Sequence, residues 1–151
     1  MTIALLSLLM ACGPVELLDL DLQTEAQLQA LAIAAACREA ACGDRPVLVP
    51  RDTSQDLRQA LAASLPNEIR YFDDLFAEAL LGPDGFYLDG ATAAVTSAPY
   101  ELGEKAIGVD IWTHKAQLHG MRKTYLFLWD GTAWTETTAD EVGVTLTTSV
   151  S

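Results

Sequence analysis

The sequence predicts an α+β domain in which about three N-terminal helices pack on a C-terminal, mainly antiparallel β-sheet. Apolar residues recur at helical spacing in the first half of the chain, whereas apolar and polar residues alternate in the second half. Gly- and Asp-rich turn signals separate the alternating segments. The chain has 151 residues, 50% of them hydrophobic, which suits one compact domain, and we place that domain at residues 23–151.

Three helices and two short strands are expected in the first half. Thr24 and Gln27 form a capping-box pattern at the start of an alanine-rich segment, for which Gly43 is the expected stop. Prolines bracket the first strand, and Pro66 ends the second helix. The expected elements are a helix from Thr24 to Gly43, a strand at 45–50, a helix from Thr53 or Ser54 to Pro66, a strand at 68–72 and a short helix at 73–81.

The second half of the chain is expected to form strands. In the segment 106–114, Ile107, Val109 and Ile111 share one face, so Asp110, Trp112 and His114 share the other. The dipeptide at 130–131, Asp-Gly, is a strong hairpin signal. The two early strands either join the edge of this sheet or form a small α/β lobe. The expected strands are 93–98, 106–114, 124–129, 133–137 and 142–150.

The charge balance restricts the classes of partner. The chain carries 9 Lys and Arg against 21 Asp and Glu, a formal net charge of −12. Nucleic-acid binding is therefore not expected, because phosphate contacts need clustered basic side chains. A basic protein partner would instead suit so acidic a surface. No apolar stretch reaches the 18 residues of a membrane-spanning helix.

The N-terminus has the features of a secretory signal. Residues 2–11 are apolar apart from two hydroxyl residues, carry no charge and end before Gly13-Pro14. Leu9-Met10-Ala11-Cys12 resembles the lipobox of bacterial lipoproteins. The resemblance implies that residues 1–11 are a signal peptide, that Cys12 is acylated, and that the mature protein is anchored in the cell envelope through lipid. Residues 12–22 would then be a tether or a first packed segment. A plain cleaved signal and a buried first helix of a cytoplasmic protein are the alternatives.

The remaining cysteines, Cys37 and Cys42, test this location. Five residues of regular α-helix would separate their Cα atoms by about 7.5 Å along the axis, beyond the roughly 7 Å that a disulfide tolerates. A bridge therefore requires the helix to unwind near Ala40–Ala41, which Gly43 makes plausible. In an oxidising envelope the pair is expected to form a disulfide, and the alternative is two buried thiols.

Side chains with catalytic potential are sparse. The chain has two histidines, His114 and His119, both in or beside a hairpin, and no third ligand suggests a metal site. No serine-nucleophile elbow and no glycine-rich phosphate loop is present. We therefore expect no cofactor and a non-catalytic binding or structural domain. An acidic inhibitor or immunity-type protein is the alternative, and a small hydrolase using His114 and Asp110 has the least support.

Aromatic residues are the strongest candidates for a binding site. Trp112, Tyr125, Trp129 and Trp134 all fall in three consecutive predicted strands. Trp129 and Trp134 flank the predicted turn at 130–131, so they should pair across the hairpin. The four side chains either belong to the core or form an exposed groove for an apolar ligand, a glycan or a partner.

Overall fold

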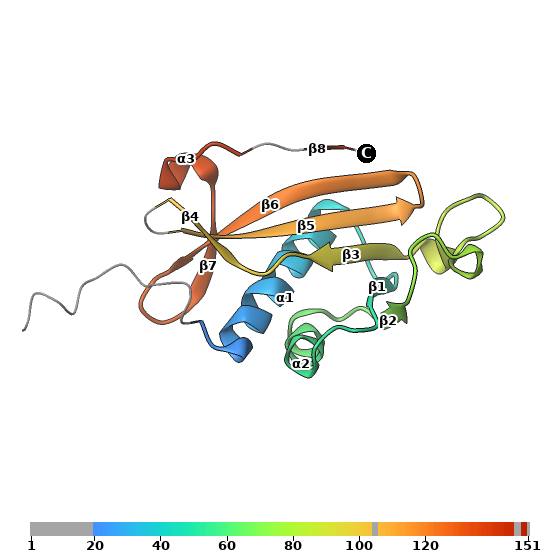
Figure 1. Cartoon of the computed structure of the whole chain (residues 1–151), viewed down its shortest axis with the longest axis horizontal. Helices are drawn as coiled ribbons and strands as arrows, with labels where there is room; N and C mark the ends of the chain where they lie inside the picture. The colour runs from blue at the N-terminus through green and yellow to red at the C-terminus, as the bar shows by residue number, and fades with distance from the viewer. Residues whose placement is uncertain (1–19, 104–105, 147–148, 151) are drawn as a thin grey trace, which may run out of the picture.

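One mixed sheet is the frame of the molecule, which the computed structural model describes over residues 20–103, 106–146 and 149–150 (Figure 1). Its strand order is β2-β1-β3-β5-β6-β7, with β4 beside β5 and β8 beside β6. The strands are β1 Val47–Pro50, β2 Ile69–Phe72, β3 Thr92–Thr96, β4 Tyr100–Leu102, β5 Ala106–Ala116, β6 His119–Trp129, β7 Trp134–Thr137 and β8 Ser149–Val150. The helices are α1 Leu22–Glu39, α2 Gln55–Ser64 and α3 Ala139–Val142.

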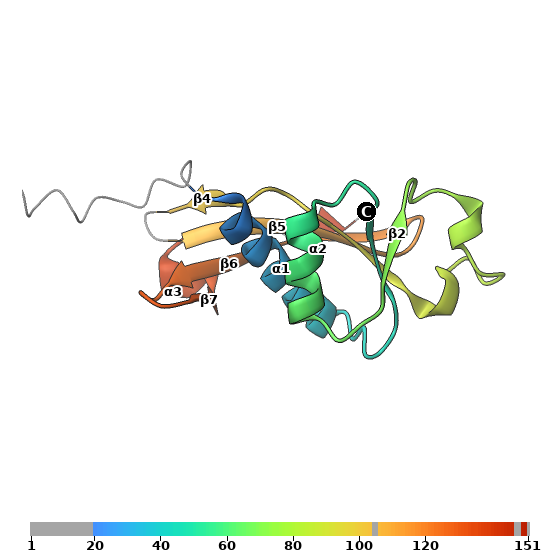
Figure 2. The same cartoon turned by 90° about the horizontal axis from the view of Figure 1, so that it is seen from below.

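Helices α1 and α2 lie on the same side of the sheet, with α1 against the strands and α2 packed on α1 (Figure 2). The alanines of α1 let both neighbours approach its backbone closely, and most of its middle turns are buried. Leu28 and Ile33 from α1 and Leu61 from α2 are completely or almost completely buried. Together with Val109 and Phe127 of the sheet they belong to the main hydrophobic core.

The two early strands join the sheet as parallel strands at one edge, so the sheet is not purely antiparallel. β1 pairs in parallel with both β2 and β3. The reason is the connection: α2 carries the chain from one end of β1 back to the start of β2, as a parallel crossover requires. The other described pairings, from β3 through β8, are antiparallel.

The alternation predicted for the second half is confirmed by the β5–β6 hairpin. Val109 lies opposite Tyr125 and Ile107 lies opposite Phe127, and all four side chains are buried in the core beneath α1. Asp110, the next residue along, therefore points to the opposite face. β5 and β6 are each longer than expected, because the hairpin continues to its tip at 117–118.

The helix predicted at residues 73–81 is wrong. This segment has turns and one short 3₁₀ helix, Glu78–Leu80, instead of a regular α-helix. The Asp74 carboxylate accepts the backbone N–H of Phe76 at 2.9 Å, which closes a turn that competes with helix formation. Two other elements differ from their predicted bounds. Asp21 rather than Thr24 caps α1, and within the region 142–150 the described strand is Ser149–Val150.

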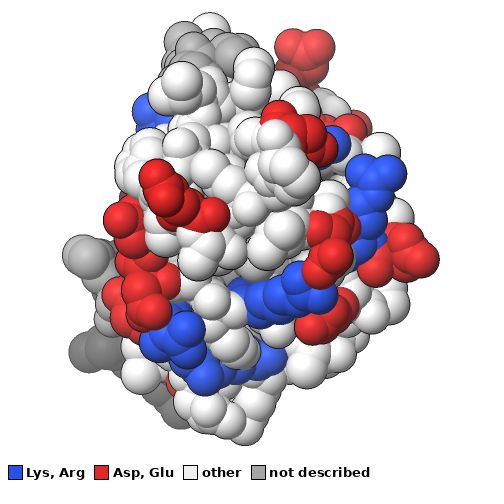
Figure 3. Space-filling view, turned by 90° about the vertical axis from the view of Figure 1, so that its right-hand side faces the viewer, with Lys and Arg blue, Asp and Glu red and all other residues white. Residues whose placement is uncertain are grey.

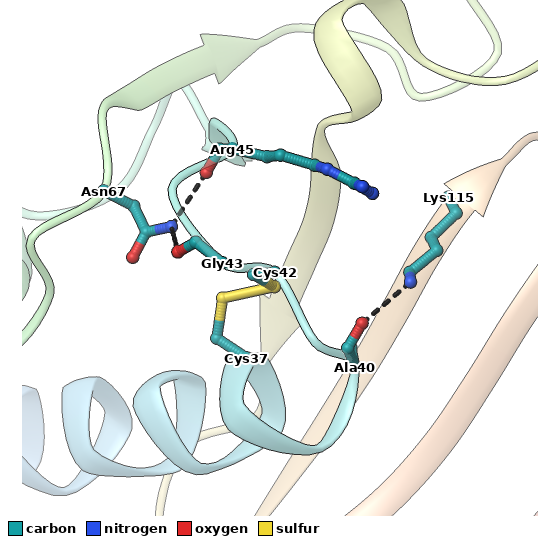
Figure 4. Close-up of a disulfide and its surroundings, with 7 residues drawn as sticks. All are labelled: Cys37, Ala40, Cys42, Gly43, Arg45, Asn67 and Lys115. Carbon is teal, nitrogen blue, oxygen red and sulfur yellow. Dashed lines mark hydrogen bonds between the residues drawn. A yellow bond between two sulfur atoms is a disulfide. The ribbon is translucent and has the colours of Figure 1, made fainter.

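The disulfide between Cys37 and Cys42 is present, with Cα atoms 5.2 Å apart (Figure 4). α1 ends before the predicted stop at Gly43, as a bridge requires: Ala40 is its C-cap, and Ala41 adopts a left-handed backbone conformation with φ of 52°. The amide of Asn67 donates to the carbonyls of Gly43 and Arg45, which ties the turn to the segment that leads into β2. The disulfide indicates a non-reducing environment. No helix within the described ranges has the length and apolar character needed to cross a membrane.

Candidate functional site

A groove of about 570 Å³ opens between α1, α2 and the turn that joins β6 to β7. Its volume lies within the range of small-molecule sites in proteins, about 300–1,000 Å³. We call it the tryptophan groove, because two indole rings form one of its walls. Its lining residues are Gln23, Gln27 and Leu31 of α1, Asp56, Gln59, Ala60, Ala63 and Ser64 of α2, and Trp129, Thr132, Ala133 and Trp134 of the hairpin.

The hairpin wall is fixed by its turn. Trp129 and Trp134 pair across the strands as predicted, with ring centroids 5.4 Å apart and planes inclined at 55°. One Asp130 oxygen accepts the backbone N–H groups of Thr132 and Ala133, and these hydrogen bonds lower the pKa of the carboxyl. Gly131 has φ of 99°, a conformation that favours glycine. The turn therefore presents the two indoles in a defined orientation.

The two indoles differ in burial, and that difference is relevant to binding. Trp134 is partly buried and packs against the main core, whereas 49% of Trp129 is exposed. An exposed indole that packs against a partly buried neighbour offers a ring face to a ligand, and a Trp side chain has only two rotatable bonds to fix on binding.

The helical walls bring side chains together at regular spacing. Gln23, Gln27 and Leu31 follow at intervals of four residues, so they form one stripe along α1. Asp56 and Gln59 lie one turn apart on α2. Gln23, Gln27 and Gln59 are exposed, so their amides are free to meet a ligand. Asp56 is the one charged side chain among the described residues that line the groove.

Of the four aromatic residues that the sequence singled out, the structure brings two together. Trp129 and Trp134 share the tryptophan groove. Tyr125 is 5% exposed and lies in the core beneath α1. Its hydroxyl donates to Glu39 at 2.9 Å, and burial followed by this hydrogen bond raises its pKa. Trp112 lies on the other face of the sheet, where the Arg122 guanidinium sits 5.2 Å from its ring centroid.

Asp110 is the centre of a polar cluster on that other face. Its carboxylate is 4% exposed and accepts hydrogen bonds from the Tyr100 hydroxyl at 2.6 Å, the Thr124 hydroxyl at 2.7 Å and the Arg122 guanidinium. Burial raises the pKa of Asp110, but the three hydrogen bonds outweigh burial and the pKa lies below its ordinary value. The Tyr100 ring lies directly on Gly108, where an added Cβ would come within 3.0 Å of it. This cluster joins β4, β5 and β6.

The histidines do not form a site with one another or with Asp110. His114 lies on the same face as Asp110, but four residues of strand separate their Cα atoms by about 13 Å. Its partly buried imidazole has a pKa lowered by desolvation. His119 stacks on Phe86, with ring centroids 6.3 Å apart. Among the described residues, no group of three or more His, Cys, Asp or Glu side chains is placed to hold a metal ion.

A second hollow of about 520 Å³ lies beside the tip of the β5–β6 hairpin. Phe86, Lys115, His119 and Met121 are among its lining residues. It adjoins the end of the molecule shown in Figure 3, where uncharged surface is framed by acidic and basic side chains. The ammonium of Lys115 donates to the carbonyl of Ala40 at 2.8 Å, so this cation is engaged within the fold. The exposed large apolar side chains near this end are Phe76, Phe86, Leu88, Leu118 and Met121.

Cys12 and the signal peptide predicted at residues 1–11 lie outside the described residues. The glutamines of the groove were not singled out from the sequence. Their spacing along α1 is a visible signal, but only the tertiary fold brings that stripe beside a hairpin about a hundred residues later.

The chain was compared with protein-family models, with curated proteins and with solved structures, and none of the three comparisons found a match.

Proposed function

We propose that the chain is a cell-envelope lipoprotein whose domain binds a ligand in the tryptophan groove without transforming it. The observation that carries the proposal is the groove itself, in which a half-exposed indole, a packed indole and three exposed glutamines face one space. Convergent aromatic and polar side chains around a concave site are typical of ligand binding.

The proposed location in the cell envelope is supported by two independent features. Leu9-Met10-Ala11-Cys12 resembles a lipobox, and the Cys37–Cys42 disulfide fits an oxidising compartment. With Cys12 acylated, nine residues separate the anchor from the start of α1 at Leu22, a reach of at most about 35 Å. Gln23, at the α1 end of the groove, would therefore stay close to the membrane surface.

The composition of the groove supports binding over hydrolysis. Enzymes that cleave glycosidic bonds use a pair of carboxyl groups on either side of the bond. Asp56 is the single carboxyl among the described lining residues. Acyl-transfer chemistry needs a nucleophile beside a base, and no His or Cys stands among the same residues.

Metabolic labelling tests the proposed lipid anchor at Cys12. Cells that express the full chain are grown with palmitate carrying a label, and the wild type is compared with Cys12→Ala and with the control Cys42→Ala. We expect labelling of the wild type and of Cys42→Ala and none of Cys12→Ala. Equal labelling of all three would contradict acylation at Cys12.

Capture of a basic protein is the second candidate function, and the net charge of −12 favours it. Opposite charges steer association and make its rate depend on ionic strength. A basic protein that co-purifies at low salt and is released when salt is raised to about 0.5 M would support this function. Retention that is independent of salt would contradict an electrostatic partner.

A further inference from the structure

We propose that the ligand of the tryptophan groove is a neutral oligosaccharide, an inference that rests on the proposed binding function of this site. The groove combines an exposed aromatic face, side-chain amides and an absence of cationic lining residues among those described. Each of these features matches one property of a sugar chain.

The indole of Trp129 matches the apolar face of a pyranose ring. A pyranose carries C–H groups on its faces and hydroxyl groups around its edge. The C–H groups are weakly positive and pack on the negative face of an aromatic ring. Trp129 is 49% exposed, and Trp134 supports it at a centroid distance of 5.4 Å. A ring that is exposed and also packs against a neighbouring side chain suits such stacking.

The glutamines match the hydroxyl groups. A sugar hydroxyl both donates and accepts a hydrogen bond, and a primary amide likewise has two donors and an acceptor. Gln23, Gln27 and Gln59 are exposed at the groove, and the Thr132 side chain adds a hydroxyl. A lipid chain or an apolar peptide would leave these amides without partners, which is unfavourable on desolvation.

The charge of the groove excludes anionic sugars. Asp56 is the single charged lining residue among those described, and the whole chain carries −12. A uronic acid or a sugar phosphate would need Lys or Arg partners to offset its desolvation. A neutral sugar avoids this cost, and Asp56 can accept hydrogen bonds from its hydroxyl groups.

The shape of the groove favours a chain over a single sugar. The α1 stripe from Gln23 to Leu31 covers eight helical steps, or about 12 Å along the helix axis. The groove is open to solvent on one side and has a volume of about 570 Å³. An open, elongated site accepts several linked rings and lets the remaining chain leave at its ends.

Calorimetric titration of the full chain tests the proposal. The protein is kept in a polyoxyethylene detergent, because a sugar-based detergent would compete, and is titrated with maltotriose, cellotriose and triacetylchitotriose. We expect at least one of the three to bind. Gln27→Ala and Gln59→Ala should each weaken that binding at least about threefold, and Trp129→Ala about tenfold. Two control variants should leave the sugar affinity unchanged. Gln55→Ala replaces an exposed glutamine of α2 that lies outside the groove, and Trp112→Phe changes a side chain on the other face of the sheet.

The glutamine variants keep the test decisive even if Trp129→Ala fails to fold, because both side chains are exposed. Trigalacturonate should bind at least about tenfold more weakly than the best neutral sugar, and equal binding would overturn the inference. A parallel titration uses the uncharged apolar dye N-phenyl-1-naphthylamine. Dye binding that Gln59→Ala or Trp129→Ala weakens, with no response to any sugar, would overturn the sugar but keep the groove as a binding site. No response to sugars or dye would overturn both.

Discussion

Replacing Asp110 with Asn should destabilise the domain by about 2–3 kcal/mol, because the carboxylate is buried and accepts three side-chain hydrogen bonds. A hydrogen bond to a charged group contributes about 1.5 kcal/mol or more, which assigns about 3 kcal/mol to Tyr100 and Thr124 together. Arg122 adds about 0.5–1 kcal/mol, since its side chain is 48% exposed and solvent screens the pair. The two hydroxyls donate to the same carboxylate oxygen, so the carbonyl of Asn can keep both hydrogen bonds only in their weaker, neutral form. Its amide N–H2 then faces the Arg122 guanidinium, which is itself a donor, so the Arg122 pair and the charge-assisted part of the hydroxyl bonds are lost.

Urea denaturation followed by circular dichroism measures this effect, with Tyr100→Phe and Thr124→Val as single-bond controls expected to cost about 1–2 kcal/mol each. The pKa of Asp110 is lowered in the folded state, so its contribution is complete above the ordinary carboxyl pKa and is lost as the pH falls through the folded value. The gap between wild type and Asp110→Asn should therefore shrink below about pH 4. A loss under about 1 kcal/mol at pH 7, or a gap that widens in acid, would mean that the hydrogen bonds to Asp110 do not stabilise the fold as proposed.

Three further changes probe other parts of the fold. Replacing both Cys37 and Cys42 by Ala should lower the free energy of unfolding by about 2 kcal/mol, which is the loop entropy of a six-residue ring. In denaturant titrations, adding reductant to this double variant should then have no further effect. Leu28→Ala removes a side chain that is 0% exposed and should cost about 2–5 kcal/mol, and a cost below about 1 kcal/mol would place Leu28 outside the core. Gly131→Ala should cost about 1–2 kcal/mol by forcing φ away from 99°, and a thermal melt equal to that of the wild type would contradict a strained turn.

Much of the fold follows from local signals in the sequence. The caps and breaks of α2, the proline-bracketed β1 and the alternation in β5 are properties of neighbouring residues, and each was predicted close to its observed position. The segment 73–81 shows the limit of local pattern. Its composition suits a helix, but the Asp74 turn holds it in turns, and so does the packing of Leu75 and Leu80. These two side chains pack on a second, smaller core that is separate from the main one and is formed by Leu48, Phe72, Tyr87, Ala91 and Ala93.

Long-range pairing was harder to predict. The parallel placement of β1 between β2 and β3 depends on where α2 packs, and nothing within a four-residue strand encodes that. The disulfide was predictable because the spacing of its cysteines fixed how far α1 had to unwind, and the left-handed Ala41 supplies that turn.

The candidate site was predictable only in part, for the same reason. The Trp129–Trp134 pair depends on a local hairpin, so the sequence indicated it. Its partners Gln27 and Gln59 come from two helices that only tertiary packing brings to the hairpin. Tyr125 shares a strand face with Trp129, yet α1 covers it, because alternation identifies the two faces of a strand without saying which part of a face a helix covers.

The indole N–H resonances of the three tryptophans test the binding groove most directly. In a ¹H–¹⁵N spectrum each indole gives its own signal, and single Trp→Phe variants assign them. On titration with the neutral trisaccharide that binds best, the Trp129 and Trp134 signals should shift together and saturate with the affinity found by calorimetry, while Trp112 stays in place on the far face of the sheet. A shift of Trp112 alone, or three signals unmoved by every neutral trisaccharide, would contradict sugar binding in the tryptophan groove.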